Sequence, residues 1–256
     1  MRLENKTAIV TGSASGIGLG IAEKYADEGA NVVITDIVAD GEVVAENICQ
    51  AGGKAIFIQA DLRSETEVRE LMQQTIDTFG SLDILVNNAG VTCRTTVLTA
   101  DDDEWDRVMN TNLKGAWYCC KHAIPLMIER GGGSIVNISS THVTRTQWNH
   151  FPYHSAKAGL HAMTHGLTVD FGDQGIRANN ICPGFIMTPM GEKWLNHFPD
   201  VEKKKQAMLA HHPVGRFGTP EDVAAVAVFL ASDEASFISG SSIVVDGGRS
   251  ALQRSD

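Results

Sequence analysis

Tyr153 and Lys157 are spaced so that their side chains could act together in proton transfer. They are four residues apart, so on a helix they lie on one face, one turn from each other. An ammonium group near a phenol favours the phenolate and lowers the phenol pKa from about 10 toward neutrality. Such a phenol could accept or donate a catalytic proton. Ser140, thirteen positions before Tyr153 at the end of an apolar run, could donate a hydrogen bond to a carbonyl or alkoxide oxygen.

A glycine-rich turn near the N-terminus indicates a binding site for a pyrophosphate. The buried-strand pattern at 7–11 leads directly into this turn, and a helical pattern follows it to about Gly29. Glycines allow close backbone approach, and the first amides of a helix bind negative charge. The turn reads Gly12-Ser13-Ala14-Ser15-Gly16-Ile17-Gly18. This spacing departs from the G-x-G-x-x-G fingerprint and lacks the lysine of a P-loop, so a loop without a ligand is the alternative at this point.

Asp36 strengthens the case for a dinucleotide. It ends a second strand pattern at 31–36, about twenty residues after the glycine turn. A carboxylate there can accept hydrogen bonds from both hydroxyls of an adenosine ribose. It would also repel a ribose 2′-phosphate, and no Arg or Lys stands among residues 12–18 or at Ile37 to attract one. The sequence therefore predicts NAD rather than NADP as the cofactor.

Six motifs, in order and spacing, resemble the classical short-chain dehydrogenase/reductase family, and the resemblance covers the chain from Leu3 to Gly248. The motifs are Thr11-Gly12-x3-Gly16-x-Gly18, Asn87-Asn88-Ala89-Gly90, Asn112, Ser140, Tyr153-x3-Lys157 and Pro183-Gly184. The resemblance implies an oxidoreductase in which Tyr153 is the general acid–base and Ser140 holds the reacting oxygen. It further implies that Lys157 lowers the tyrosine pKa and binds the nicotinamide ribose, and that Asn112 keeps a proton-relay water in place.

The same resemblance implies a set of residues along the cofactor. Asp61 and Leu62 should flank the adenine, and the segment from Pro183 to Thr188 should contact the nicotinamide end. The full predicted set is Gly12, Ser15, Gly16, Ile17, Gly18, Asp36, Ile37, Asp61, Leu62, Asn88, Ala89, Gly90, Tyr153, Lys157, Pro183, Gly184, Ile186 and Thr188.

Composition and periodicity predict an α/β fold. The chain has 256 residues and is 43% hydrophobic, which is enough for one large core, and strand-like and helix-like stretches alternate along it. We expect a single Rossmann-type, doubly wound domain over residues 1–256, with a seven-stranded parallel sheet and helices on both faces. The strands should lie near 7–11, 31–36, 54–59, 83–87, 133–139, 176–181 and 241–245, and the site should form at their carboxyl ends.

Charge, hydropathy and cysteine spacing exclude several other classes. A formal net charge of −10 argues against a nucleic-acid partner, and Lys203-Lys204-Lys205 is expected to be a solvated helix face. The apolar stretches are interrupted by charges or glycines, and the N-terminus lacks the apolar core of a signal peptide, so we expect a cytoplasmic protein without a membrane partner. The five cysteines show no metal-ligand spacing, so no metal site is predicted. Family members are commonly tetramers, so by resemblance we expect a homotetramer.

The segment between Ser140 and Tyr153, together with the residues after Gly90, is expected to line the substrate pocket. It is rich in hydrogen-bond donors and poor in aliphatic side chains, which favours a small polar substrate over a lipid or steroid. Ser140 and Tyr153 themselves should contact the substrate. A covering loop is expected at about 187–215.

Four further side chains are predicted to contact the substrate. Arg94 and Arg145 could pair with a carboxylate, and the indole of Trp148 could stack on a sugar. His142 is similar to positions in aldose 1-dehydrogenases and in 3-hydroxybutyrate dehydrogenases, where it helps hold a carboxylate. The alternatives are that Arg145 points to solvent and that Trp148 packs under the loop.

The predicted function is NAD-dependent hydride transfer between the nicotinamide and a secondary alcohol, ketone or lactol of a sugar, polyol or sugar acid. A sugar acid would satisfy both the arginines and the indole. Three alternatives stay open: a hydroxy-acid dehydrogenase of the 3-hydroxybutyrate type, a reductase of ketones bound to acyl carrier protein, and a non-catalytic dinucleotide-binding protein on the same fold.

Overall fold

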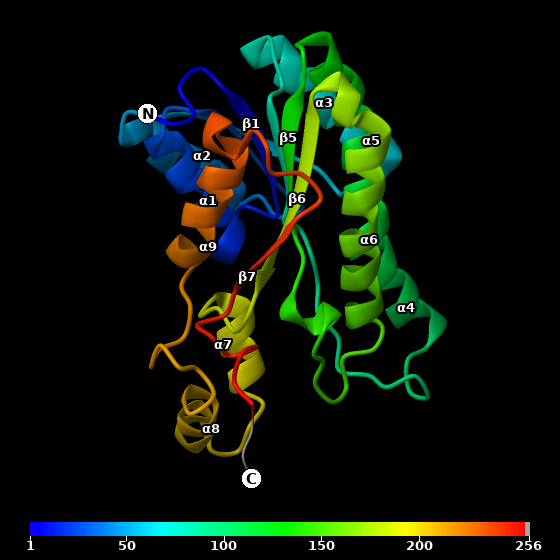
Figure 1. Ribbon diagram of the computed structural model, residues 1–256, viewed down its shortest axis with the longest axis vertical. Coiled ribbons are helices and arrows are strands. Elements are labelled where there is room, and N and C mark those ends of the chain that lie inside the picture. Colours follow the sequence, from blue (N-terminus) through cyan, green and yellow to red (C-terminus); the bar gives the residue numbers. More distant parts are fainter. Residues whose placement is uncertain (254–256) are drawn as a thin grey trace.

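A seven-stranded parallel sheet lies between two layers of helices in the computed structural model, which describes residues 1–253 (Figure 1). The strands lie in the order β3-β2-β1-β4-β5-β6-β7. Their bounds are β1 Thr7–Thr11, β2 Asn31–Asp36, β3 Lys54–Gln59, β4 Ile84–Asn87, β5 Gly133–Ile138, β6 Ile176–Pro183 and β7 Ser242–Val245. The predicted doubly wound fold is confirmed, and each strand ends within two residues of its predicted bounds.

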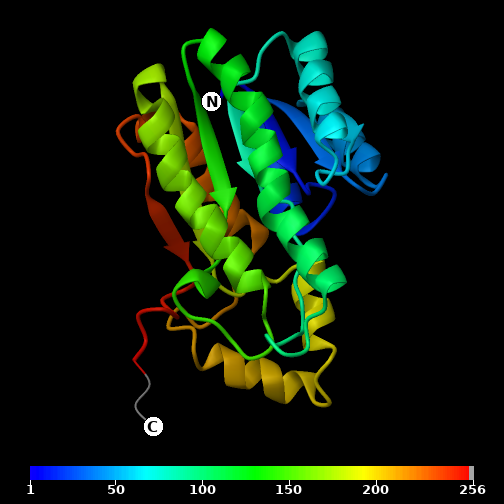
Figure 2. The ribbon, with the colours of Figure 1, turned by 90° about the vertical axis from the view of Figure 1, so that its right-hand side faces the viewer.

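Helices cover both faces of the sheet (Figures 1 and 2). One face carries α1 (Gly16–Asp27), α2 (Gly41–Gln50) and α9 (Pro220–Ala231). The other carries α3 (Glu65–Phe79), α5 (Gly115–Glu129) and α6 (Tyr153–Phe171). The helix α4 (Asp102–Met109) passes into α5 through a π-helical turn at Asn110–Lys114, and α7 (Pro189–Leu195) and α8 (Val201–Leu209) lie beyond the carboxyl ends of the strands.

The strands are continuously apolar because each buries both of its faces. In β1, Ala8 and Val10 pack into the core under α1 and α9, whereas Ile9 between them packs into the core under α3 and α5. This alternation follows from the two-residue period of a strand. No helix within residues 1–253 is long and apolar enough to cross a membrane.

The order in which successive strands are added to the sheet reverses between β1 and β4, while all strands stay parallel. Connections from β1 run to β2 and β3 on one side, and those from β4 run to β5, β6 and β7 on the other. In an open parallel sheet the crevice at such a reversal is where ligands bind, just beyond the carboxyl ends of the strands. The glycine turn after β1 lies at this point.

A buried row of polar side chains crosses the sheet beneath α6. The Asn87 amide donates to Asn137 Oδ1 at 2.8 Å, and the Asn137 amide donates to Thr164 Oγ1 at 2.8 Å. The Thr164 hydroxyl donates in turn to Asn180 Oδ1 at 2.8 Å. These residues come from β4, β5, α6 and β6, and all four are buried. Buried polar groups need such partners, so the row holds α6 at one position over the sheet.

Candidate active site

The glycine turn packs so closely that side chains would not fit in it. Gly12 has a φ of 64°, and a Cβ there would lie 2.7 Å from the Ala89 Cα. A Cβ on Gly18 would lie 2.3 Å from the Gly12 carbonyl oxygen. Ser15 stands at the N-cap of α1, but its side chain makes no capping hydrogen bond within the described chain. The first amides of α1 are therefore available to an anionic ligand.

A cavity of about 620 Å³ runs from this turn along the carboxyl ends of the central strands. Every residue predicted along the cofactor lines it except Gly18, whose role is close packing against Gly12. Open helix amides at one point and carboxylates farther along fit a pyrophosphate and a ribose. The residues present therefore suit a dinucleotide.

Asp36 lies at the end of this cavity away from Tyr153. Its Oδ2 accepts from the Ala14 amide at 3.2 Å and its Oδ1 from the Ile37 amide at 2.8 Å, so the carboxylate is fixed at the lip of the cavity. Arg63 also lines the cavity. Its guanidinium is held by both carboxylate oxygens of Asp61, at 2.6 Å and 2.9 Å, and this pairing holds the pKa of Asp61 below its usual value. The guanidinium of Arg63 thus already has an acidic partner.

Ser140, Tyr153 and Lys157 meet at the other end of the cavity. The Lys157 ammonium is 4% exposed, donates to the Ile138 carbonyl at 2.7 Å and lies 5.9 Å from the centre of the Tyr153 ring. Burial raises the pKa of the Tyr153 phenol, partly offset by its hydrogen bond with Ser140, and burial lowers the pKa of Lys157 to about 8. Burial outweighs the hydrogen bond at the phenol, and both groups lose their solvation together. The effect of Lys157 on the tyrosine pKa stays a prediction.

Asn112 lies beside this cluster on the π-helical turn. Its Oδ1 accepts from the Val91 amide at 2.7 Å and its Nδ2 donates to the Val91 carbonyl at 2.8 Å. A Cβ placed on Gly90 would lie 3.3 Å from Asn112 Oδ1 and 3.5 Å from Lys157 Nζ. The asparagine side chain therefore fixes the segment after β4 against the lysine. Its water-holding role stays a prediction.

Two histidines form the wall beyond Tyr153. The His142 ring packs edge-on against the Tyr153 ring at 5.5 Å between centroids, and the His150 ring lies 4.7 Å from His142. Burial, with His150 and Arg249 nearby, lowers the pKa of His142 to about 4, so the ring is neutral at pH 7. A neutral imidazole there can donate or accept a hydrogen bond beside the phenol.

A family model described as enoyl-(acyl carrier protein) reductase matches residues 12–250. An uncharacterised oxidoreductase of Thermotoga maritima is 39% identical over 249 residues, covering 96% of each chain. A 3-oxoacyl-[acyl-carrier-protein] reductase of the same organism is 37% identical over 249 residues, covering 97% of this chain and 99% of that one.

Solved structures match over nearly the full length. A short-chain dehydrogenase/reductase from Burkholderia xenovorans has a TM-score of 0.95 at 36% identity and covers 99% of both chains. The chain belongs to the short-chain dehydrogenase/reductase family. A 7α-hydroxysteroid dehydrogenase in complex with NADH and 7-oxo glycochenodeoxycholic acid has a TM-score of 0.91 at 36% identity, covering 96% and 95%. A structure named as an NAD(P)-dependent gluconate 5-dehydrogenase from Beutenbergia cavernae, with bound NADP, has a TM-score of 0.91 at 32% identity, covering 98% of both chains.

Membership of this family makes the chain an oxidoreductase that acts on CH–OH groups with a nicotinamide dinucleotide. The non-catalytic alternative loses its basis, since Tyr153, Lys157 and Ser140 are all present and meet in one cavity. The neighbours bind NADH in one case and NADP in another, so they leave the choice of dinucleotide open.

The predicted substrate residues divide between two cavities. His142 lines the cavity that holds Tyr153, and it also lines a second, adjoining cavity. Arg94, Arg145 and Trp148 line only the second, and the Trp148 side chain is 92% exposed. The alternative that Trp148 packs under the loop is wrong. Trp148 does not line the cavity that holds Tyr153, so its indole does not lie beside the phenol.

Gln147 and His150, from the segment expected to line the substrate pocket, and Trp194, from the expected covering loop, line both cavities. Lys204 and Arg249, which line the second cavity, were not predicted from the sequence. The expectation that Lys204 belongs to a solvated helix face is wrong, because its ammonium lies 4.4 Å from the Phe198 ring centre. The sequence signal for this contact is the pair of aromatic residues shortly before α8, Trp194 and Phe198, whose rings lie near the Lys204 ammonium.

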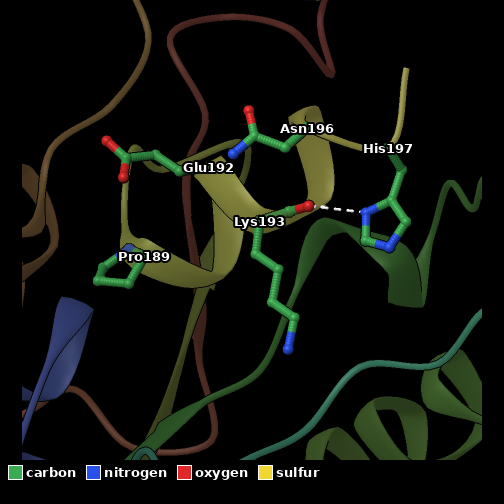
Figure 3. Close-up of a pocket in the computed structure, with 5 residues that line it drawn as sticks. All are labelled: Pro189, Glu192, Lys193, Asn196 and His197. Atoms are coloured by element: carbon green, nitrogen blue, oxygen red, sulfur yellow. Dashed lines mark hydrogen bonds between the residues drawn. The ribbon is translucent and has the colours of Figure 1, made fainter. Parts of the chain in front are cut away.

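The expected covering segment forms two short helices, α7 and α8, beyond the strand ends (Figure 1). A smaller hollow of about 390 Å³ lies against α7 and is lined by Pro189, Glu192, Lys193, Asn196 and His197 (Figure 3). His197 Nδ1 is hydrogen-bonded to the Lys193 carbonyl at 2.7 Å, as the dashed line in Figure 3 shows. None of the predicted catalytic residues lines this hollow, which shares only Pro189 with the described lining of the active-site cavity.

Proposed function

We propose that this protein is an NAD-dependent dehydrogenase that oxidises a secondary alcohol or lactol of a small polar substrate, of which a sugar acid fits best. The observation that carries the proposal is one continuous cavity with Asp36 at the ribose end and Ser140, Tyr153 and Lys157 at the other. The cofactor, when bound, supplies the hydride acceptor. The chain supplies position, charge and the proton acceptor.

In this proposal Tyr153 takes the hydroxyl proton of the substrate, and Ser140 holds the same oxygen by a hydrogen bond. Lys157 binds the nicotinamide ribose, and its hydrogen bond to the Ile138 carbonyl holds the ammonium at the wall of the cavity. Asn112 supports the segment at Gly90 that the lysine faces. Water is kept away by α7 and the loop that carries His142, both of which contribute to the wall of the cavity.

The polar wall of the site supports a polar substrate. His142, Gln147 and His150 line the region beyond Tyr153, and each offers a hydrogen-bonding group. One structural neighbour is named as a gluconate 5-dehydrogenase, and a sugar acid such as gluconate agrees with this lining. The steroid-binding neighbour indicates that the fold itself does not restrict the substrate.

Substrate panels test the proposal directly. With NAD in excess, NADH formation should occur with sugar acids or hydroxy acids and be slower with the matched neutral aldoses and polyols. Tyr153→Phe should bind NAD as tightly as the unmodified chain but lose at least 99% of turnover, since removing a general acid–base costs about 10²–10⁴ in rate. Retention of more than a few per cent of the rate in that variant would refute the role of the phenol.

Cofactor choice is tested with a double variant at Asp36 and Ile37. A unit charge about 4 Å from the 2′-phosphate costs roughly 1–4 kcal/mol, so NAD should be preferred by about fivefold or more. Asp36→Ala with Ile37→Arg should shift the preference toward NADP, because it removes the repulsion and adds a cation. Unchanged NAD selectivity in that variant would count against Asp36 as the ribose contact.

A reductase of ketones bound to acyl carrier protein is the second candidate, because one full-length relative has that name. Reduction of an acyl-carrier-protein ketone with NADPH, faster than any alcohol oxidation with NAD, would favour it. The net charge of −10 argues against it, since an acidic carrier would be repelled by an acidic enzyme.

A further inference from the structure

A second cavity of about 1010 Å³ adjoins the active-site cavity. Its walls are the 141–150 loop, α8, Arg94 and the chain after β7, at 249–253. The two cavities share His142, Gln147, His150 and Trp194. Because His142 also touches the Tyr153 ring, a ligand in the second cavity can be continuous with one that reacts at Tyr153.

The charge of this cavity has one sign. Arg94, Arg145, Lys204 and Arg249 line it, and no Asp or Glu is among the described residues that do. This is unusual in a chain whose net charge is −10. Arg94 and Arg145 are exposed, and Lys204 and Arg249 are half-buried. A cleft lined by charges of one sign raises the local concentration of an anionic ligand.

Three of the cations of this cavity differ from other cations in the protein because they have no acidic partner among the described residues. Arg63 and Arg216, for example, are each paired with an aspartate. Within residues 1–253, Arg94, Arg145 and Lys204 form no ion pair. Their positive charge is therefore not neutralised by the part of the chain that the structure describes.

The position of Lys204 is set by aromatic rings. Its ammonium lies 4.4 Å from the Phe198 ring centre and 5.4 Å from that of Trp194. Such cation–π contacts hold an ammonium without cancelling its charge. The other cations act on the two histidines of the wall. Burial is the main cause that lowers the pKa values of His142 and His150, and Arg249 lowers that of His142 further, as Arg94 does that of His150.

We propose that this cavity binds a phosphate group that the substrate carries at a distance from its reacting carbon. A single carboxylate is satisfied by one bidentate guanidinium, whereas the three side chains Arg94, Arg145 and Lys204 together match a group of higher charge. The volume also exceeds what a small hydroxy acid fills, since about 300–1,000 Å³ accommodates a drug-sized ligand. That the bound molecule is oxidised at Tyr153 rests on the proposed function. That the cavity binds phosphate does not depend on it.

The first experiment measures phosphate binding without turnover. Inorganic pyrophosphate is titrated calorimetrically into the NAD-loaded protein at fixed ionic strength. Lys204→Gln and Arg145→Gln should each weaken binding about tenfold, since a charged hydrogen bond contributes about 1.5 kcal/mol or more. Lys203→Gln is the matched control, because it is the exposed neighbour on α8 outside the cavity lining, and it should change binding less than twofold. Equal effects of Lys203→Gln and Lys204→Gln, or no effect of either cavity variant, overturn the inference.

The second experiment identifies the carrier of the phosphate. Gluconate 6-phosphate is compared with gluconate, and 3-hydroxybutyryl-coenzyme A with the same acid on a phosphate-free thiol, by NADH formation. In at least one of these two pairs, the KM of the phosphorylated substrate should be at least tenfold lower than that of its phosphate-free partner. Lys204→Gln should remove this difference in KM without changing kcat. Turnover of the phosphate-free members alone, with no inhibition by pyrophosphate, contradicts the inference but leaves the proposed dehydrogenase intact. Variant-sensitive pyrophosphate binding without turnover of any alcohol supports the phosphate site and refutes the proposed reaction.

Discussion

Replacing Lys157 by methionine should make the folded protein more stable at pH 7 while abolishing turnover. The lysine is 4% exposed, and burial lowers its pKa from 10.5 to about 8. At 1.36 kcal/mol for each pH unit, keeping the ammonium charged in the folded protein costs about 3 kcal/mol. Methionine removes this cost but leaves the Ile138 carbonyl without its donor at 2.7 Å, a loss of about 1–2 kcal/mol. The net gain in the free energy of unfolding is about 1–2 kcal/mol.

The gain should depend on pH in a defined direction. Below about pH 8 the lysine is charged in both the folded and the unfolded protein, so the full cost of burial is present. Between about pH 8 and 10.5 the folded protein releases the proton while the unfolded chain keeps it, and the stability of the unmodified protein rises. By pH 10.5 the cost has gone, and the methionine variant should be the less stable one.

Urea unfolding followed by circular dichroism at pH 7 and pH 10 measures this change of sign. Lys203→Met, an exposed site on α8, controls for adding a methionine and should show the same small difference at both pH values. A Lys157→Met variant that is less stable than the unmodified protein by the same amount at both pH values would show that burial does not perturb this ammonium.

Two further substitutions test how the site is held in place. Gly18→Ala should weaken both NAD binding and stability, because its Cβ would lie 2.3 Å from the Gly12 carbonyl oxygen. Gly166→Ala is the matched control: it has open space on α6 and should stabilise the protein by about 0.5–1 kcal/mol. Fluorescence titration with NADH measures binding, and thermal unfolding measures stability. Asn137→Ala should lower the free energy of unfolding by about 1–3 kcal/mol, because two buried hydrogen bonds are lost. Asn87 keeps only its contact with Cys120, and Thr164 keeps its bond to Asn180. Urea unfolding against the exposed control Asn47→Ala measures the loss.

The cofactor half of the site could be predicted because its signals are local. A strand, a turn and a helix adjoin in sequence around Gly12, and Asp36 follows at the end of the next strand, so the topology brings them to one edge. The pKa of Tyr153 could not be predicted from the spacing to Lys157, because spacing contains no information on burial. The π-helical geometry at Asn112 was also missed, since a helical pattern does not distinguish one widened turn.

The substrate half depends on contacts that sequence order hides. Lys204 and Arg249 reach the same cavity as Arg94 from segments more than a hundred residues away. Only the folding of α8 and the C-terminal segment back over the strand ends brings them together. A run of three lysines looks like a solvated face unless the position of Phe198 is known. The oligomeric state and the cellular compartment stay predictions.

The buried row from Asn87 to Asn180 fastens the helix α6 to the sheet through Thr164, eleven residues after Tyr153 on the same helix. At 1.5 Å per residue, the phenol lies about 16 Å along the helix axis from this attachment. The positions of Tyr153 and Lys157 are therefore set by the attachment of α6 to the sheet rather than by the loops around the substrate. The loop at 141–150 and the α7–α8 segment can consequently change in length or sequence without displacing the proton acceptor. New substrates can thus be accommodated on this scaffold while the machinery of hydride transfer stays in register.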